Sequence, residues 1–376
     1  MHKRIMIIAG EPSGDFHASR LIHALKKINP DIEISGIGAD NMRRAGAELY
    51  FDISELSIIG FTGVLTNLKK IKHIFKAILE KIDAQRPDAV VLIDYPGFNL
   101  KLAQEVKKRG IKVIYYISPQ IWAWWKGRIK TIQRFVDKMI VVFKFEEALY
   151  KTRGIDVSFV GHPLLEEAYS QLSREDFLNN LGLTPQKPTI GLAPGSRGME
   201  VERILPILLE SAKIIKQRLP QSQFALLKAP GLERGLFENK IKKYDVPVVA
   251  WEGRSYDFLG ACDFVLVASG TATLETAIMQ KPMAIVYKVS FLNWLIARCL
   301  IRLPFIGLVN VIAGKKIVPE FIQHKARASL IAQKTLDILS SQEELTKIKS
   351  RLMQLRQELG TPGASQRAAE IISSFI

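Results

Sequence analysis

The sequence predicts an α/β protein with two doubly wound, Rossmann-like domains that face a cleft, followed by a helical C-terminal tail. Short β-branched apolar runs alternate with longer amphipathic stretches, which is typical of βαβ units around a parallel sheet. The alternation pauses after Gly161-His162-Pro163 and restarts at Thr189. The chain also has 376 residues, which is long for one domain and ample for two.

The first half contains five runs that are apolar on both faces, as parallel strands covered by helices must be. They are Arg4–Ala9, Ile32–Gly36, Ala89–Asp94, Lys112–Ile117 and Lys138–Val142. Amphipathic helices are predicted between them at Phe16–Ile28 and Phe98–Arg109, the second ending at Gly110. We assign residues 1–170 to this N-terminal domain.

The second half repeats the pattern after a polar connection at residues 171–188, which is predicted to contain a short helix. Its expected strands are Thr189–Ala193, Gln223–Leu227, Val246–Ala250, Asp263–Ala268 and Met283–Tyr287. These runs place a C-terminal domain at residues 189–340. Residues 341–376 are predicted to be helical, with packing back onto the first domain as one option.

The composition restricts the classes of partner. The net charge is +16, from 53 basic and 37 acidic residues, which favours anionic partners such as phosphates or an acidic membrane surface. The basic residues are spread over helices and no nucleic-acid recognition motif occurs, so we expect no nucleic-acid partner. The two cysteines, Cys262 and Cys299, have no metal-ligand spacing and fit a reducing cytosol. No apolar stretch approaches the roughly 18 residues of a membrane-spanning helix.

Two turns in the second domain have the features of phosphate sites. One strand runs into Pro194-Gly195-Ser196-Arg197-Gly198, and another runs into Ser269-Gly270-Thr271, each opening a helix. Glycines let the backbone approach a phosphate, the helix N-terminus supplies free amides, and Arg197 adds a bidentate cation. Glu275, one turn into the second helix, is placed to accept from ribose hydroxyls. We therefore predict a diphosphate ligand held by Gly195, Ser196, Arg197, Ser269, Gly270 and Thr271.

Polar residues also follow the strands of the first domain, where ligands bind in open α/β sheets. The first strand leads into Gly10-Glu11-Pro12-Ser13-Gly14-Asp15, in which Asp15 is equally well explained as a helix cap. Asp94 precedes a Pro-Gly turn and is placed as a general base, or as an acceptor for the amides of that turn. Three tryptophans crowd a later loop at Trp122, Trp124 and Trp125, where they would stack on sugars or pack one domain on the other.

Several motifs are absent from the sequence. No complete G-x-G-x-x-G and no G-x-x-x-x-G-K-[ST] occurs, which disfavours dinucleotide and P-loop proteins. No Asp-x-Asp pair is present to offer a metal to a diphosphate. We therefore expect no metal and no cofactor, with fixed cations and helix dipoles stabilising a departing diphosphate.

Two amphipathic basic stretches, Leu65–Ile82 and Val289–Ile312, fit either an anionic membrane interface or helices with a solvated basic face. The first is consistent with both. The second is apolar too far round for a one-sided helix, which favours membrane contact through Trp294 and Phe305.

The ordered motifs resemble those of the lipid-A-disaccharide synthase family over essentially the whole chain. The resemblance rests on Ala9–Asp15, Ile93–Asn99, Ser118–Trp124, Gly161–Pro163, Pro194–Glu200, Ser269–Glu275 and Asn310–Glu320. It implies a two-Rossmann (GT-B) fold whose N-terminal domain binds the acceptor and whose C-terminal domain binds the UDP-sugar. It also implies an inverting transfer from UDP-2,3-diacylglucosamine to 2,3-diacylglucosamine 1-phosphate. The enzymes of this family work on the cytoplasmic face of the bacterial inner membrane.

The resemblance also assigns roles to individual residues. It makes Asp94 the base that takes the proton from the acceptor hydroxyl, with Glu11 as a second candidate. Further residues are expected to contact substrates or shape the cleft: Ser13, Asp15, Asn99, Trp122, His162, Asn310 and Gln323. The oligomeric state stays open, with a homodimer as one option.

Alternatives remain at this stage. Another GT-B enzyme, such as a peptidoglycan N-acetylglucosamine transferase or a UDP-N-acetylglucosamine epimerase, would share the two phosphate turns. Three residues depart from the family pattern: Gly97, Lys144 and Val309. They leave room for a paralogue with a different acceptor.

Overall fold

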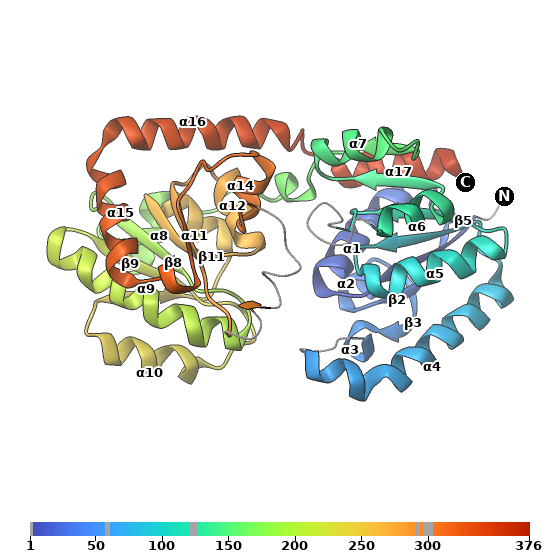
Figure 1. The fold of residues 1–376 in the computed structure, drawn as a ribbon, viewed down its shortest axis with the longest axis horizontal. Helices are drawn as coiled ribbons and strands as arrows, with labels where there is room; N and C mark the ends of the chain where they lie inside the picture. Colours follow the sequence, from blue (N-terminus) through green and yellow to red (C-terminus); the bar gives the residue numbers. More distant parts are fainter. Residues whose placement is uncertain (1–2, 57–60, 120–126, 291–293, 296–303) are drawn as a thin grey trace. The chain divides into compact units, whose positions relative to one another are not determined.

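The structure is a computed structural model that describes residues 3–56, 61–119, 127–290, 294–295 and 304–376 (Figure 1). The chain divides into two compact units, each built around its own parallel sheet. Unit 1 comprises Met1–Glu166 and Leu359–Ile376, and unit 2 comprises Glu167–Glu358. The predicted fold class, two parallel α/β sheets followed by C-terminal helices, is confirmed.

The described residues of unit 1 form a seven-stranded parallel sheet with the order β3-β2-β1-β4-β5-β6-β7. Its strands are β1 (Arg4–Ala9), β2 (Glu33–Gly38), β3 (Glu48–Asp52), β4 (Ala89–Ile93), β5 (Lys112–Tyr116), β6 (Lys138–Val141) and β7 (Val157–Phe159). The chain winds outward in both directions from the neighbours β1 and β4. The carboxyl ends of these two strands therefore mark the topological switch point, where open α/β sheets bind ligands.

The helices of unit 1 cover both faces of this sheet (Figure 1). They are α1 (Pro12–Ile28), α2 (Asp40–Arg44), α3 (Ile53–Leu56), α4 (Phe61–Gln85), α5 (Pro96–Lys108), α6 (Arg128–Phe135), α7 (Lys144–Lys151), η1 (Pro163–Glu166) and α17 (Ala364–Phe375). Two of them begin earlier than predicted: α1 at Pro12 and α5 at Pro96. Proline at the first helical position fits both starts, because its missing N–H would be unpaired there anyway.

The helix α4 contains the whole of the first amphipathic basic stretch. Ile74, Ile78 and Ile82 are fully buried in the hydrophobic core of unit 1, together with side chains of β4 and α5. Lys69 and Lys70 are exposed. The described part of this stretch is thus a core helix with a solvated basic face, which is one of the two interpretations left open by the sequence.

The last helix, α17, belongs to unit 1 although α15 and α16 belong to unit 2. It packs along α1, so the two ends of the chain lie close together (Figure 1). The amine of Lys3 donates to the backbone carbonyl of Ile376 at 2.6 Å. The ring of Phe375 lies 5.2 Å from the amine of Lys112.

Unit 2 has a six-stranded parallel sheet within the described residues, with the order β10-β9-β8-β11-β12-β13. The strands are β8 (Thr189–Ala193), β9 (Gln223–Leu227), β10 (Val248–Trp251), β11 (Phe264–Ala268), β12 (Met283–Tyr287) and β13 (Glu320–Ile322). The order reverses between β8 and β11. These strands are followed by the two turns that the sequence singled out as phosphate sites.

The helices of unit 2 are α8 (Arg174–Asn180), α9 (Gly198–Arg218), α10 (Arg234–Tyr244), α11 (Ser255–Ala261), α12 (Thr271–Ile278), α14 (Leu308–Ile312), η2 (Gln323–Lys325), α15 (Ala328–Ser340) and α16 (Gln342–Glu358). The polar stretch before β8 is fixed to this unit. The carboxylate of Asp257 accepts from the backbone of Gln171 at 2.6 Å and of Leu172 at 3.1 Å.

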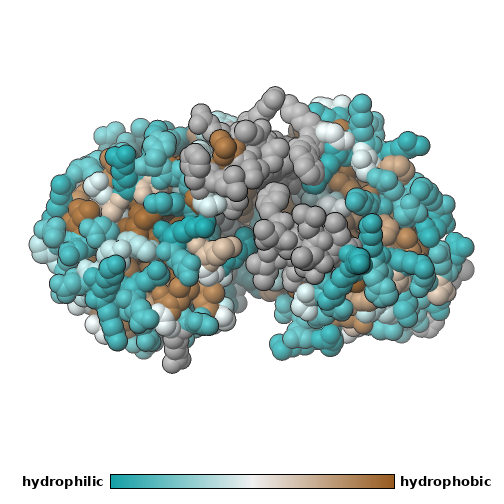
Figure 2. Space-filling view, turned by 60° about the horizontal axis from the view of Figure 1, so that its bottom comes forward, coloured by the Kyte–Doolittle hydropathy of each residue, from teal (hydrophilic) through white to brown (hydrophobic). Residues whose placement is uncertain are grey.

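The surface of both units is mostly hydrophilic on the face seen in Figure 2, with smaller hydrophobic areas between the polar residues. The strands β1, β4, β8 and β11 are buried along nearly their whole length. The apolar side chains are therefore concentrated within the two sheets and the helices that cover them.

Candidate active site

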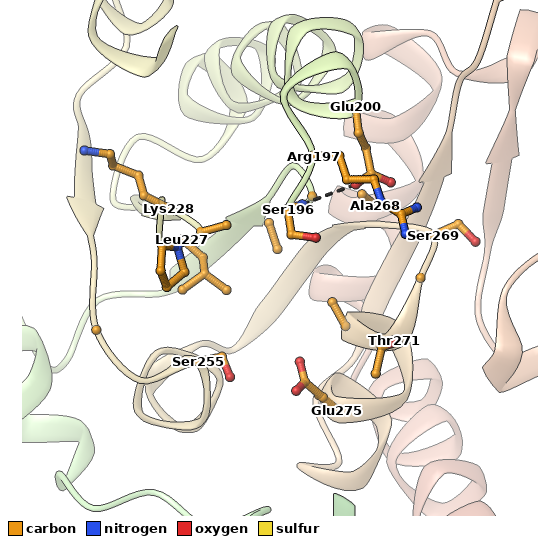
Figure 3. Close-up of a pocket in the computed structure, with 17 residues that line it drawn as sticks. Ser196, Arg197, Glu200, Leu227, Lys228, Ser255, Ala268, Ser269, Thr271 and Glu275 are labelled. Carbon is orange, nitrogen blue, oxygen red and sulfur yellow. Dashed lines mark hydrogen bonds between the residues drawn. The ribbon is translucent and has the colours of Figure 1, made fainter. Parts of the chain in front are cut away.

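A pocket of about 440 Å³ opens at the switch point of unit 2 (Figure 3). Its wall comes from the ends of four neighbouring strands and from the helices that follow them. The lining residues are Ala193, Gly195, Ser196, Arg197, Glu200, Leu227, Lys228, Ala229, Pro230, Gly253, Ser255, Ala268, Ser269, Gly270, Thr271, Ala272 and Glu275. All seven residues predicted to hold a nucleotide diphosphate and its ribose are in this set.

The first turn in the pocket brings backbone amides to the start of α9. Gly195 has a φ of +114°, and a Cβ there would lie 2.2 Å from a carboxylate oxygen of Glu200. Only glycine fits this position without displacing Glu200. The backbone N–H of Ser196 donates to that carboxylate at 3.2 Å. The side chain of Arg197 is exposed and lies beside it (Figure 3).

The second turn places the start of α12 against the same pocket. Gly270 precedes the helix, and the hydroxyl of Thr273 donates to the Gly270 carbonyl at 2.7 Å. The hydroxyl of Ser269 reaches the Ile306 carbonyl at 3.5 Å. Two helix N-termini and one guanidinium therefore give this pocket positive potential, which suits an anionic ligand.

Glu275 provides a carboxylate on the opposite side of the pocket from Arg197 (Figure 3). Burial raises the pKa of Glu275; the nearby hydroxyl of Tyr256 lowers it and the charge of Glu167 raises it. Arg254 stacks over Tyr256 and Tyr169, with distances of 5.5 Å and 4.5 Å from its guanidinium carbon to the ring centroids. Glu275 is thus backed by protein side chains and not by bulk water.

Sequence reasoning missed the part of the wall that follows β9 and β10. Leu227, Lys228 and Ser255 line the pocket, and the amine of the buried Lys228 forms an ion pair with Glu252. These residues also lie at the carboxyl ends of parallel strands. The strand-end rule that found the other two turns would have included them, but they lack the glycine-rich pattern that drew attention.

The switch point of unit 1 brings together Glu11, Asp94 and Tyr95. Asp94 and Tyr95 both have a φ of +45°, which ends β4 one residue before the predicted boundary. The pKa of Asp94 is raised to about 6, mainly by burial and also by the charge of Glu11, with a smaller lowering effect from the backbone N–H of Tyr95. A half-buried carboxyl group with this pKa is well matched to proton abstraction near neutral pH.

The strained backbone at Asp94 is held from behind by two buried side chains. The amide of Asn99 donates to the carbonyls of Ile93 at 3.1 Å and Asp94 at 2.8 Å. The hydroxyl of Tyr115 also donates to the Asp94 carbonyl. Asn99 was predicted to contact substrate or shape the cleft; it is fully buried, and its amide holds the backbone at Asp94.

The whole chain matches a known family. A family model described as lipid-A-disaccharide synthetase matches residues 5–375. The lipid-A-disaccharide synthase of Syntrophus aciditrophicus is 44% identical over 375 residues, which cover 100% of this chain and 98% of that protein. The chain belongs to the lipid-A-disaccharide synthase family. The synthase of Geobacter sulfurreducens is 41% identical over 373 residues, which cover 99% of this chain and 97% of that protein.

Solved structures agree on the fold. The UDP-GlcNAc 2-epimerase of Neisseria meningitidis bound to UDP-GlcNAc superposes with a TM-score of 0.63 at 12% identity, covering 99% of this chain and 100% of that one. MurG of Acinetobacter baumannii gives 0.60 at 13%, covering 99% of each chain. As a member of the lipid-A-disaccharide synthase family, the chain is a UDP-sugar glycosyltransferase of the GT-B fold.

The other predicted residues near the start of α1 differ in their exposure to solvent. Glu11 and Ser13 are exposed at the start of α1. Asp15 is buried, and its carboxylate accepts from Ala39 N at 2.6 Å, Asn41 Nδ2 at 2.8 Å and Met42 N at 3.2 Å. It therefore caps α2, a different helix from the one that contains it.

His162 is also buried, at the end of unit 1 where the chain leaves the sheet. Its Nδ1 accepts from Leu164 N at 3.2 Å, and its ring lies 5.1 Å from that of Phe143. The pKa of His162 is lowered to about 3, mainly by burial and also by its interaction with His17. The imidazole is neutral at physiological pH. Trp122 lies outside the described residues.

Asn310 and Gln323 lie apart from the pocket lining. Both protons of the Asn310 amide are donated, to Val318 O at 2.9 Å and Glu320 Oε1 at 2.8 Å, and its oxygen accepts from Ile317 N and Val318 N. Gln323 exchanges two hydrogen bonds with the backbone of Val289. A direct contact between the buried Asn310 amide and substrate would require its bonds to break, whereas the half-buried Gln323 amide has one further N–H.

Trp294 and Phe305 are half-buried at the borders of a segment that lies mainly outside the described residues. In the part of the chain that the structure describes, no helix is long and apolar enough to cross a membrane. No group of three or more His, Cys, Asp and Glu side chains in that part could hold a metal ion.

Proposed function

We propose that this family member transfers 2,3-diacylglucosamine from UDP-2,3-diacylglucosamine to 2,3-diacylglucosamine 1-phosphate. The products are a β-1,6-linked disaccharide 1-phosphate and UDP. The pocket of unit 2 supports this proposal most directly, because it joins two helix N-termini, Arg197 and Glu275 around a space at the switch point. A nucleoside diphosphate matches this combination, with phosphates on the amides and ribose on the carboxylate.

In the proposed donor complex, the diphosphate contacts Arg197 and the backbone around Gly195, Ser196 and Ser269–Thr271. The ribose hydroxyls donate to Glu275. Leu227, Ala229 and Pro230 give the apolar part of the wall, which suits a flat base. The sugar and its acyl chains lie outside this set of contacts.

The proposed reaction is a single displacement. The 6-hydroxyl oxygen of the acceptor attacks the anomeric carbon of the donor, and its proton passes to the carboxylate of Asp94. The bond between that carbon and the diphosphate oxygen breaks, and the electron pair leaves with UDP. The configuration at the anomeric carbon inverts. Arg197 and the two helix N-termini stabilise the negative charge on the departing diphosphate, in the role that a metal ion has in other enzymes.

Asp94 is supported as the base by its raised pKa of about 6, which keeps the carboxylate largely ionised near neutral pH yet basic enough to accept a proton. Glu11 contributes to that pKa by its charge. We assign Glu11 a supporting role, in which it tunes Asp94 and orients the acceptor.

The decisive test is product formation by the purified protein. Mixed with both acylated substrates, the wild type should form the disaccharide and release an equal amount of UDP. Arg197→Ala should weaken UDP binding by about 10- to 100-fold, the value of one charge-assisted contact. Folded protein that forms no disaccharide would refute the proposed reaction. UDP binding that is unchanged in Arg197→Ala would refute the proposed donor site.

We also propose that the protein works at the surface of the bacterial inner membrane, on its cytoplasmic side. Its net charge of +16 favours anionic lipids, and acylated substrates reside in a bilayer. Replacing Trp294 and Phe305 with serine should reduce co-sedimentation with vesicles that contain anionic lipid. Unchanged binding would remove these two residues from the membrane contact. A homodimer stays a prediction, which sedimentation velocity of the purified protein would test.

A further inference from the structure

Glu200 is an acidic residue on the side of the pocket that is proposed to bind the diphosphate. It lies in the first turn of α9, and its half-buried carboxylate lines the pocket between the turn at Gly195 and Arg197 (Figure 3). A carboxylate at this position repels a diphosphate. The proposed donor contacts assign it no role, so its presence needs an explanation.

The carboxylate occupies the backbone donors that a phosphate would use. It accepts from Ser196 N at 3.2 Å and also interacts with the backbone N–H of Arg197. Two successive amides pointing at one anion form a nest of the kind that binds phosphate oxygens. The carboxylate also lies directly over Gly195, where a Cβ would be 2.2 Å from its oxygen. Glu200 therefore covers the part of the backbone that glycine leaves open.

A purely structural role would be helix capping. Glu at the third helical position often reaches back to the free amides before the first turn, and Gln serves equally well there. Capping alone accounts for the hydrogen bonds. It leaves room for a second role, because the carboxylate also lines the ligand space beside the guanidinium of Arg197 (Figure 3).

We propose that Glu200 is a displaceable internal anion, which occupies the amides of the Gly195–Arg197 turn in the donor-free protein and leaves them when the diphosphate binds. This inference rests on the proposed donor site. The carboxylate keeps the turn and Arg197 in place while the pocket is empty. It competes with bound UDP and so promotes release of the product after transfer. Glu200 therefore lowers the affinity for the donor and raises the rate of turnover.

The pH dependence of this competition follows from the groups around Glu200. Arg197 lies beside it on the turn, Tyr287 approaches from the end of β12, and Lys228 and Glu275 line the same pocket from β9 and α12. Burial raises the pKa of Glu200, while the amides of Ser196 and Arg197 and the Arg197 charge lower it. A neighbouring diphosphate adds negative charge and favours the protonated form further. Competition by Glu200 is therefore strongest at high pH, where the carboxylate is ionised.

The test compares Glu200→Gln with wild type in calorimetric titrations with UDP. Glutamine keeps the length of the side chain and can still cap the helix, so the variant should fold. The matched control is Glu202→Gln, which removes the same charge two residues further along α9, where the side chain is exposed and outside the pocket lining. We expect Glu200→Gln to bind UDP about tenfold more tightly than wild type and Glu202→Gln to change the Kd less than twofold.

Three results decide the inference. The ratio of the wild-type Kd to the Glu200→Gln Kd should rise between pH 5.5 and pH 8, because Glu200 is more ionised at the higher pH. Ionisation of UDP is common to both proteins and cancels in the ratio. In the transfer reaction, Glu200→Gln should lower both the donor KM and kcat and increase inhibition by UDP. A Kd in Glu200→Gln equal to or above that of wild type, or a ratio that does not rise with pH, would overturn the competitor role and leave helix capping.

The companion variant Arg197→Ala separates this failure from failure of the proposed site. If Arg197→Ala weakens UDP binding while Glu200→Gln has no effect, the diphosphate site stands and the displacement mechanism falls. If neither variant changes the Kd, UDP binds elsewhere and both proposals fall.

Discussion

The switch-point sites of the two units occupy the same place in their sheets but use different chemical groups. In unit 2, backbone amides at the starts of α9 and α12 surround a pocket together with Arg197. In unit 1, a half-buried carboxyl group stands on strained backbone, with φ of +45° at both Asp94 and Tyr95. One site offers positive potential to a ligand that arrives charged. The other maintains an acid group whose pKa lies close to neutral.

The comparison teaches which changes each site tolerates. Backbone donors cannot be removed by substituting a side chain, so single replacements around the diphosphate should change UDP binding by no more than about 100-fold in either direction. The acid-base site depends on one carboxyl group and on the neighbours that set its pKa. Single replacements there should affect chemistry strongly and UDP binding little.

The largest effect is expected for Asp94→Asn. Asparagine tolerates the left-handed backbone conformation at this position and has the same shape, so the turn should persist. Removing the base should lower kcat by about 10²- to 10⁴-fold, while the Kd for UDP stays within twofold of wild type. Single-turnover assays and UDP titrations measure the two quantities. A variant that retains more than a tenth of the wild-type rate would exclude Asp94 as the base.

The sequence predicted the central part of both sites because the rule behind it is topological. Thr189–Ala193, Gln223–Leu227 and Met283–Tyr287 were predicted with the observed bounds, since they are apolar on both faces and bordered by polar residues. Once the strands are known, the turns after β8 and β11 follow as ligand sites. The residues around Glu11 and Asp94 follow in the same way in unit 1.

The sequence did not reveal three strands, β3, β7 and β13, which lie at edges of the two sheets. Most of their residues are only half-buried, so they lack the continuous apolar run that marks a central strand. The role of Asp15 as a cap of α2 could not be predicted from the sequence either. Its partners lie 24 to 27 residues further along the chain, and no local pattern indicates that its carboxylate caps α2.

A smaller effect is expected for Glu11→Gln, which tests the electrostatic part of the unit 1 site. The charge of Glu11 helps to raise the pKa of Asp94 to about 6, and burial makes the larger contribution. The reaction requires ionised Asp94, so the rate of the wild type should fall as the pH drops through about 6. Without the Glu11 charge the pKa of Asp94 decreases, and the acidic limb of the kcat profile should move to lower pH. An unmoved limb would show that Glu11 does not tune Asp94.

The smallest effect is expected for Tyr256→Phe, which tests the carboxylate of the unit 2 pocket. The Tyr256 hydroxyl lies next to Glu275 and lowers its pKa against the effect of burial. Loss of the hydroxyl favours protonated Glu275, which accepts less well from ribose hydroxyls. We expect a rise of about two- to fivefold in the donor KM, close to the value of one neutral hydrogen bond, with kcat unchanged. The rise should be larger at pH 6 than at pH 8, because a higher pKa leaves less of the carboxylate ionised at low pH. The matched control is Tyr169→Phe, which keeps the ring that stacks on Arg254 and removes a hydroxyl that is not among the groups shifting the pKa of Glu275. A fall in kcat at constant KM in Tyr256→Phe would contradict this division between the two sites, because it would give a neighbour of Glu275 a part in the chemical step.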